Sequence, residues 1–303
     1  MTKKQRDYLD SILRAGSLDL TVPVTELREN FASFMGDKPV PSGITTTDTE
    51  VGGRPALRIE PTNPRTDAIM LYFHGGSFVF GSPATARDLT AALVSRTGVP
   101  ALSLDYRLAP EHPFPAAIED GLAAYRELLQ NLAPDHIILA GDSAGGGLTI
   151  TTLLSARDAG LPMPAGAIGF SPSLDASGSG DSMTTKAAAD PIFTPEGLLG
   201  LRQNYLAGQD PRQPLLSPAI AADLTGLPPV LIQVGSNEIL LDDSTRFAVR
   251  AAAADVDVIL DVTAGVPHVF QSFTGVLDEA DAALDRAARF VADRLNHAAP
   301  AQR

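Results

Sequence analysis

Short apolar runs alternate with segments of helical periodicity over most of this chain, and this alternation limits the folds open to it. Each run is too short for a helix and is bounded by glycine, proline or polar residues, which favours buried strands. A strand, helix, strand series predicts a mostly parallel sheet with helices on both faces, an α/β fold. The expected strands are 68–73, 100–104, 137–140, 165–170, 230–234 and 256–262, and the expected helices are 85–96, 115–132, 144–159, 242–254 and 276–295.

Two segments lie outside the alternation. The first 36 residues have helical periodicity, with apolar stripes at Tyr8, Leu9, Ile12 and Leu13 and at Val24, Leu27, Phe31 and Phe34. Two β-rich runs follow, at 45–51 and 56–60. The stretch 175–217 has no strand signal and one helix, Pro195–Leu206, with Thr194 as its N-cap. We expect residues 1–43 to form N-terminal cap helices and 44–303 the main domain, with a cap insertion at about 175–217.

Composition excludes several functional classes. The 303 residues carry 23 Lys and Arg against 36 Asp and Glu, a net charge of −13, which argues against binding to nucleic acid or anionic membranes. The chain has no cysteine, which excludes disulfides, a Cys nucleophile and thiolate metal sites. No apolar run is long enough to span a membrane, and the charged N-terminus lacks the apolar core of a secretion signal. We therefore expect a cytoplasmic protein.

A serine lies where a predicted strand turns sharply into a helix. Gly141-Asp142-Ser143-Ala144-Gly145 follows the strand 137–140 and has the G-x-S-x-G pattern of a nucleophile elbow. The sharp turn brings backbone segments together, so only small residues fit around the serine. Ser143 is the predicted nucleophile, at a helix N-terminus that favours developing negative charge. No strand is followed by G-x-G-x-x-G and the chain has no G-K-[ST], so dinucleotide and P-loop sites are excluded.

Consecutive glycines follow the strand 68–73, in the sequence His74-Gly75-Gly76-Ser77. Glycines leave backbone N–H groups unobstructed, as an oxyanion hole requires. The expected donors are the N–H groups of Gly75, Gly76 and Ala144. We expect His74 to shape this loop by hydrogen bonding rather than to act as a base.

The serine needs a base, and the base needs an acid. His268 lies in the loop between the last strand and the last helix, at the sheet edge where open α/β folds bind ligands. The loop after 230–234 offers Glu238 as the acid, with Asp242 as the alternative. An acidic residue such as Asp242 is also typical of the first turn of a helix, where its charge is favourable without any catalytic role.

These motifs resemble the hormone-sensitive-lipase-like branch of the α/β-hydrolases, the bacterial family IV esterases with an HGG motif. The resemblance rests on HGG, on GDSAGG, on LDYRLAPEHPFPAAIED, on VPHVF and on the order Ser143, Glu238, His268. It implies a hydrolase fold with a helical cap, no cofactor and no metal. It also implies hydrolysis of a small-molecule ester with a small or medium acyl group, with acetyl esters and lactones as the candidate substrates. Relatives of this type often form homodimers.

The sequence departs from the family pattern at three positions. Ser77 replaces the third glycine of HGGG, Glu238 stands where Asp is usual, and Gly147 stands where many relatives have Asn. The alternatives to an esterase are a ligand-binding protein on the same fold, and an amidase or carbamate hydrolase.

Two further groups of residues have expected supporting roles. Phe34, Phe193 and Tyr205 are candidates for lining the substrate pocket, with packing between cap helices as the alternative role. The segment Leu104–Asp120 is expected to support the site through ion pairs that brace the oxyanion loop, formed by Asp105, Arg107 and Glu111.

Overall fold

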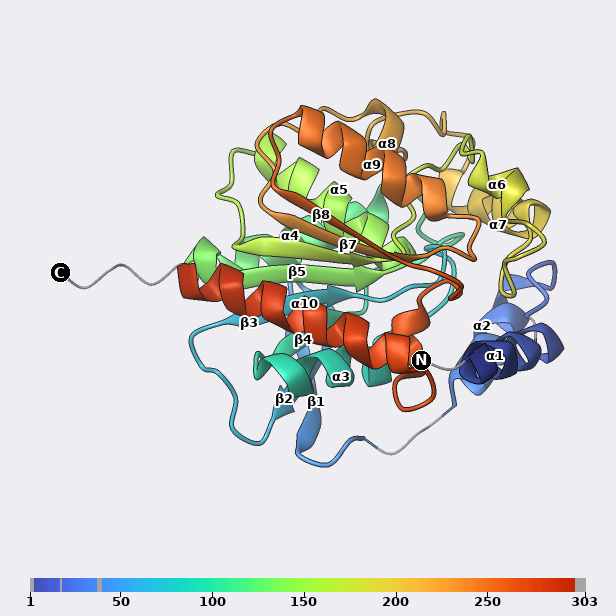
Figure 1. The fold of residues 1–303 in the computed structure, drawn as a ribbon. Coiled ribbons are helices and arrows are strands. Elements are labelled where there is room, and N and C mark those ends of the chain that lie inside the picture. The colour runs from blue at the N-terminus through green and yellow to red at the C-terminus, as the bar shows by residue number, and fades with distance from the viewer. Residues whose placement is uncertain (1–2, 17, 37–39, 298–303) are drawn as a thin grey trace.

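The computed structural model describes residues 3–16, 18–36 and 40–297, and is built on one eight-stranded sheet (Figure 1). The strand order is β1-β2-β4-β3-β5-β6-β7-β8. β1 and β2 form an antiparallel ribbon that pairs antiparallel with β4, and the strands from β4 to β8 are parallel. The strands are β1 Ile44–Val51, β2 Arg54–Pro61, β3 Ile69–Phe73, β4 Ala101–Leu104, β5 Ile137–Asp142, β6 Gly166–Phe170, β7 Val230–Gly235 and β8 Val258–Thr263.

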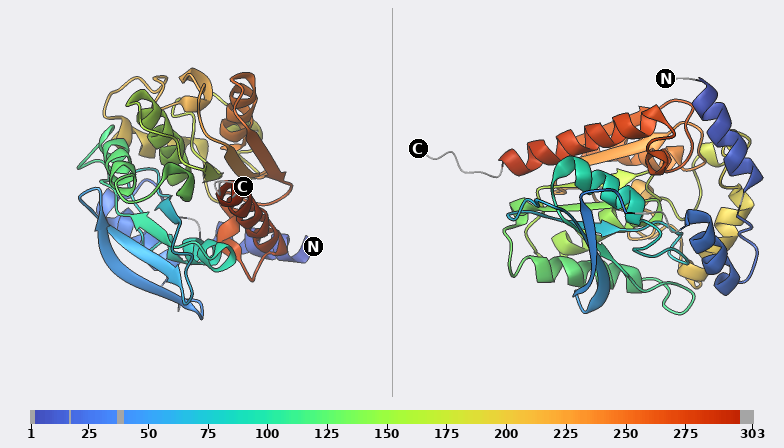
Figure 2. Two further views of the ribbon diagram at one scale, coloured as in Figure 1. Left: turned by 90° about the vertical axis from the view of Figure 1, so that its left-hand side faces the viewer. Right: turned by 90° about the horizontal axis from the view of Figure 1, so that it is seen from below.

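Helices cover both faces of the sheet (Figures 1 and 2). Leu71 and Phe73 of β3 point to one face and Met70 and Tyr72 to the other, and all four are completely buried. Burial on both faces explains why the parallel strands are continuous apolar runs. One face packs against α4 Ala116–Leu128, α5 Ala144–Asp158 and α9 Leu241–Ala253, and the other against α3 Arg87–Thr97 and α10 Asp278–His297.

The structure confirms the predicted alternation, with element ends that differ by up to four residues. The helix expected at 115–132 ends at Leu128, where the N–H groups of Gln130 and Asn131 bond to carbonyls three residues back, in turns rather than in an α-helix. The last strand begins at Val258 rather than at 256. The N–H of Val256 still bonds to the carbonyl of Ala251, at 3.0 Å, which holds that residue in the C-terminal turn of α9.

Four helices gather beyond the carboxyl ends of the parallel strands (Figures 1 and 2). They are α1 Lys3–Ala15, α2 Val24–Met35, α6 Ser182–Thr185 and α7 Pro195–Leu206. The Thr194 hydroxyl accepts the N–H of Gly197 at 3.2 Å, the expected N-cap of α7. The guanidinium of Arg14 on α1 donates to the carbonyls of Ala188 and Ala189, which ties the N-terminal helices to the 175–217 segment.

The apolar stripe of α1 is only partly buried. Leu9 and Leu13 are buried, whereas Tyr8 and Ile12 are 60% and 43% exposed. Within the expected segments 1–43 and 44–303, residues 1–2, 17, 37–39 and 298–303 lie outside the described residues. In the described chain, no helix has both the length and the apolar character needed to cross a bilayer.

Candidate active site

The predicted site residues lie in loops that follow four parallel strands of the sheet. His74–Ser77 follows β3, Ser143 follows β5, Glu238 follows β7 and His268 follows β8. Because parallel strands end at one edge of the sheet, these loops converge there. The structure brings together residues that are up to 194 positions apart in the chain, from His74 to His268.

Ser143 occupies a strained turn between β5 and α5. Its φ is 53°, a left-handed conformation that costs energy for a residue with a side chain. The neighbouring glycines make the turn possible: a Cβ at Gly145 would lie 1.9 Å from the carbonyl oxygen of Phe73, and one at Gly141 would lie 2.4 Å from the carbonyl oxygen of Gly145. The small residues of the motif are therefore required by contact, as the sequence predicts.

A hydrogen-bonded chain joins Ser143, His268 and Glu238. The Ser143 Oγ lies 2.9 Å from His268 Nε2, and His268 Nδ1 lies 2.6 Å from Glu238 Oε2. The carboxylate accepts a hydrogen bond from the Nδ1–H group, which leaves the Nε2 lone pair to accept a hydrogen bond from the Ser143 hydroxyl. Glu238 is completely buried, and the exposed fraction of His268 is 4%.

The other oxygen of the Glu238 carboxylate is also held. Its Oε1 accepts the backbone N–H of Gly235 at 2.7 Å and the Ser171 hydroxyl at 2.8 Å. Ser171 in turn accepts the N–H of Val269 at 3.0 Å, so one hydroxyl connects the acid loop to the histidine loop. Buried carboxylates require such donors, because an unpartnered charge away from water is very costly.

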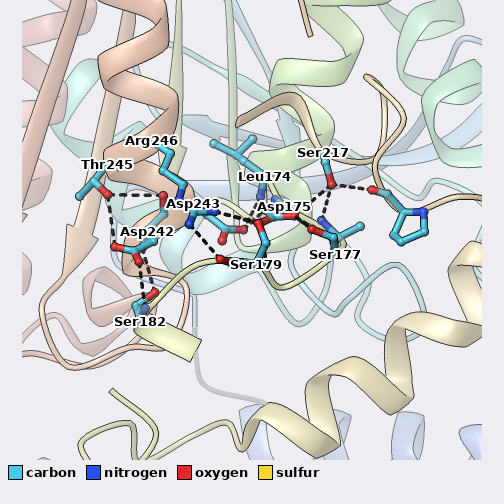
Figure 3. Close-up of polar contacts among 12 residues, drawn as sticks. Leu174, Asp175, Ser177, Ser179, Ser182, Ser217, Asp242, Asp243, Thr245 and Arg246 are labelled. Atoms are coloured by element: carbon cyan, nitrogen blue, oxygen red, sulfur yellow. Dashed lines mark hydrogen bonds and ion pairs between the residues drawn. The ribbon is translucent and has the colours of Figure 1, made fainter. Parts of the chain in front are cut away.

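Asp242, the alternative acid, has a different environment. It lies in the first turn of α9, where its Oδ2 accepts the N–H of Ser182 at 2.9 Å (Figure 3). The Ser182 hydroxyl accepts the Asp242 N–H at 3.1 Å, so the two residues cap each other. Among the described contacts of His268, the carboxylate partner is Glu238 and not Asp242.

Burial and charge act on the pKa of His268 in opposite directions. Burial alone would lower the pKa of the imidazole. The negative charge of Glu238 and its hydrogen bond, with the charges of Asp190 and Asp142, raise the pKa above its ordinary value. The site therefore favours the imidazolium that forms when the histidine takes a proton.

Asp142, inside the G-x-S-x-G motif, holds the start of the HGG loop. Burial raises the pKa of its carboxyl group to about 6, although the Tyr72 hydroxyl donates to it at 2.8 Å. The N–H of Gly75 also bonds to this carboxylate. In contrast, the N–H groups of Gly76 and Ser77 bond to no acceptor within the described part of the protein.

His74 lies under the same loop as a neutral, buried side chain. Its Nδ1–H donates to the Gly75 carbonyl at 2.8 Å, and its ring stacks on Tyr106 with centroids 4.2 Å apart. The Tyr106 hydroxyl donates to the His74 carbonyl at 2.7 Å. Burial lowers the pKa of His74 to about 4, so the ring is uncharged near neutral pH. These contacts agree with a role in shaping the loop.

The ion pairs of the 104–120 segment differ from the expected set. Arg107 pairs with Asp120, with Arg107 Nη2 2.7 Å from Asp120 Oδ1, and it also reaches Glu119. Glu111 pairs with Arg28 of α2 at 2.7 Å. Asp105 forms none of these ion pairs, and burial raises the pKa of its carboxyl.

The 104–120 segment does hold the HGG loop, through the Tyr106 hydroxyl and through the Ala109 N–H, which donates to the Phe78 carbonyl at 2.8 Å, and α2 adds a further brace. The Nε of Arg28 donates to the carbonyl of Val79 at 2.9 Å, and its Nη2 donates to the carbonyl of Ala109 at 2.9 Å. α2 is therefore hydrogen-bonded directly to the loop beside the nucleophile. The contribution of Arg28 is not evident from the sequence, because Arg28 is distant in the chain from everything it contacts.

Two cavities meet at Ser143, and they contain the three candidate pocket residues. The larger, of about 310 Å³, is lined by Phe34 and Phe193 together with His268. The smaller, of about 30 Å³, is lined by Tyr205. The Phe193 ring meets the His268 ring edge-on, with centroids 5.0 Å apart. The Tyr205 ring stacks on Phe78 at 4.0 Å.

Sequence analysis missed several residues of the site. Asp142 could have been singled out, since a carboxylate beside a nucleophile in a glycine-rich turn must find partners. Ser171 directly follows a predicted strand at the ligand-binding edge, which is a weaker signal. Tyr72 and Tyr106 carry no signal, because nothing in the sequence gives the direction of their hydroxyl groups.

Comparisons with known proteins agree with this architecture. A family model described as the alpha/beta hydrolase fold matches residues 70–272. An acetyl-hydrolase of Streptomyces hygroscopicus is 43% identical over 257 residues, which is 84% of each chain. An esterase of Acinetobacter venetianus is 40% identical over 238 residues, covering 77% of this chain and 78% of its own. The crystal structure of an esterase from the bacterial hormone-sensitive lipase family matches with a TM-score of 0.93 and 39% identity, over 97% of this chain and 99% of that one.

A solved hormone-sensitive lipase from a metagenome library gives a TM-score of 0.92 at 40% identity, over 96% of this chain and 98% of the other. The family model covers more than half of the chain, and the relatives match it along most of their length. Fold, motif order and overall likeness therefore agree. The chain belongs to the α/β-hydrolase fold family and, within it, to the bacterial hormone-sensitive-lipase-like branch.

Proposed function

We propose that this protein is a serine carboxylesterase that cleaves small-molecule carboxylic esters with small or medium acyl groups. The observation that carries the proposal is the continuous chain from Ser143 Oγ through His268 to the buried carboxylate of Glu238. The acetyl-hydrolase and esterase relatives support the ester class. In this proposal Ser143, His268 and Glu238 are the catalytic residues.

The geometry supports an acyl-enzyme mechanism. His268 Nε2 takes the Ser143 proton as Oγ attacks the ester carbonyl carbon. The imidazolium formed is stabilised by Glu238, and it then protonates the departing alkoxide oxygen. In the second half, His268 removes a proton from water, the water oxygen attacks the acyl-enzyme, and Ser143 leaves with the proton returned to its oxygen.

We propose that the oxyanion is held by the N–H groups of Gly76, Ser77 and Ala144. Gly76 and Ala144 were expected from the sequence, and Ser77 lines the small cavity together with Ser143 and Ala144. The N–H groups of Gly76 and Ser77 are free of described protein acceptors, whereas that of Gly75 bonds to Asp142. A role for Gly75 in holding the loop fits this contact better than a role as a third donor.

Hydrolysis of p-nitrophenyl acetate by the wild-type protein and by Ser143→Ala tests the function. We expect measurable turnover in the wild type and a loss of at least ~10⁵-fold in the variant, since removing a triad nucleophile leaves only residual catalysis. Ser95→Ala is the matched control, since Ser95 is an exposed residue of α3 that lines neither cavity. Wild-type-like turnover by folded Ser143→Ala refutes the proposal. No hydrolysis by the wild type points to a binding protein or to an amide substrate.

Assembly and location are separate proposals. We propose a homodimer through the edge strand β8, whose Ile259 and Val262 are 49% and 44% exposed. Its outer backbone edge pairs with no further strand of the described sheet. Size-exclusion chromatography with light scattering tests this, and a mass equal to that of the monomer refutes it.

We also propose a cytoplasmic location, which cell fractionation tests.

A further inference from the structure

The two cavities at Ser143 differ in size about tenfold, at about 310 Å³ and about 30 Å³. An ester has two sides, an acyl group and an alcohol, and both must find room around the attacked carbon. The unequal cavities therefore select among substrates, provided that each side of the ester can be assigned to one of them.

The triad geometry assigns the alcohol to the large cavity. The leaving oxygen must come within hydrogen-bonding reach of His268, which protonates it. His268 lines the large cavity and is absent from the lining of the small one. Of the proposed oxyanion donors, Ser77 and Ala144 line the small cavity and Gly76 lines the large one, so the ester carbonyl lies where the two cavities meet. The acyl chain, which cannot occupy the leaving-group side, is left with the small cavity.

The walls of the small cavity are packed side chains. A water-sized group takes about 10–15 Å³, so a cavity of about 30 Å³ holds two or three heavy atoms. Tyr205 and Leu206 of α7 line it with Leu216, and all three are at least 94% buried. The ring of Phe78 stacks on Tyr205 with an angle of 9° between their planes, so each ring is held against the other. An acetyl to butyryl group fits, and a longer chain would have to displace packed side chains.

The large cavity is apolar and reaches the protein surface between the two N-terminal helices. Ile12 of α1 and Phe34 of α2 line it and are 43% and 44% exposed, so they form its outer rim. Deeper in, Phe31, Phe193 and Phe273 are among its lining residues. An apolar alcohol of ten or more carbons has room here without any rearrangement.

We infer that the substrate is an ester of a short acyl group, of about two to four carbons, with a large apolar alcohol. This inference rests on the proposed esterase function and adds the division of the ester between the two cavities. Tyr205 is then a specificity-determining residue for the acyl side, and Phe34 is one for the alcohol side.

Two ester series test the division. In the first, the alcohol is always p-nitrophenol and the acyl group grows from C2 to C10. In the second, the acyl group is always acetyl and the alcohol grows from ethyl to decyl, including 2-phenylethyl. We expect kcat/KM to fall about tenfold or more for each two carbons beyond C4 in the first series. In the second, we expect it to rise or stay level with alcohol size.

The variants Tyr205→Ala and Tyr205→Phe test whether the Tyr205 ring sets the upper limit on acyl-chain length. Tyr205→Ala should raise kcat/KM for the C8 acyl ester relative to the acetyl ester by about tenfold or more, without changing the order of the acetate series. Tyr205→Phe keeps the ring and should keep the wild-type limit. Leu215→Ala, at a half-buried position lining the same cavity, provides a second enlargement if Tyr205→Ala does not fold.

Three outcomes overturn the inference in distinguishable ways. A level acyl series with a steep fall along the alcohol series shows that the acyl group occupies the large cavity. Level profiles in both series show that the cavities do not discriminate. If the folded protein hydrolyses no ester in either series, the proposed function itself fails, and the division between cavities fails with it.

Discussion

Replacing the triad carboxylate by an amide gives a sharp test of the site, because the structure dictates how the amide must orient. In Glu238→Gln, the Gly235 N–H can bond only to an oxygen, so the amide oxygen takes the Oε1 position. The amide NH₂ then faces His268 Nδ1, in the place of the oxygen now 2.6 Å away. Nδ1 must accept rather than donate, which moves the ring proton to Nε2, facing Ser143.

The wrong tautomer removes the base. In serine proteases the equivalent acid-to-amide change lowers kcat about 10⁴-fold, or about 5 kcal/mol of transition-state stabilisation. We expect a loss of this order in Glu238→Gln. The charge of Glu238 also helps to raise the pKa of His268, so its removal lowers that pKa. The acidic limb of the residual activity should therefore shift to lower pH.

The assay is kcat/KM for p-nitrophenyl acetate between pH 5 and 9, with thermal unfolding to show that each variant folds. Asp242→Asn is the matched control, because its amide oxygen can still accept the Ser182 N–H. It should stay within about threefold of the wild type, as expected for a half-exposed substitution outside the triad. A Glu238→Gln protein within about tenfold of wild-type activity refutes the argument, as does an equal loss in Asp242→Asn.

Three further predictions concern the residues around the triad. Ser171→Ala should lower the free energy of unfolding by about 1.5–3 kcal/mol in chemical denaturation at pH 7, because the buried Glu238 carboxylate loses a donor. An unchanged free energy of unfolding would contradict a stabilising role for this hydroxyl. Arg28→Ala should lower the free energy of unfolding by about 1–3 kcal/mol and should also lower kcat, because the Val79 carbonyl loses its partner beside the nucleophile. An unaltered kcat would show that this contact of α2 does not support the HGG loop. Asp243 is a buried residue in the first turn of α9, and its carboxylate accepts the Leu174 N–H at 2.7 Å (Figure 3). Burial raises the pKa of Asp243 from 3.8 to about 7, so the stability that its protonation contributes is complete below pH 3.8 and is lost by about pH 7. The Tm of the wild type should therefore fall between about pH 4 and 7, and Asp243→Asn should flatten that fall.

The fold was largely predictable because buried parallel strands leave a strong signal. Continuous apolar runs separated by helices indicate a covered parallel sheet, and the sheet edge then collects the loops that carry Ser143 and His268. The choice of acid was less determined, since Glu238 lies just before α9 and Asp242 in its first turn, and the direction of each side chain depends on the turn into the helix.

Contacts between distant segments were the least predictable part. The Ser171 hydroxyl reaches Glu238 across 67 residues, and Tyr72 reaches Asp142 across 70. Both contacts depend on strand register and on the direction of one hydroxyl group, neither of which a single sequence encodes as a local pattern. The apolar stripe on α1 illustrates the same point. The helical spacing predicts that Tyr8 is buried with Leu9 and Leu13, yet its side chain is exposed.

The walls of the two cavities come from parts of the chain that are far apart. The N-terminal helices α1 and α2 supply much of the large cavity, whereas α7, about 160 residues later, supplies much of the small one. Substitutions in the two walls share few partners, so their effects on specificity should add in free energy. A gene of this kind can therefore exchange one wall by recombination near its 5′ end and keep the other wall and the triad unchanged, as long as the new segment retains Arg28 and its contacts to the HGG loop. Such modularity lets the preference for one half of the substrate evolve while the other half stays fixed.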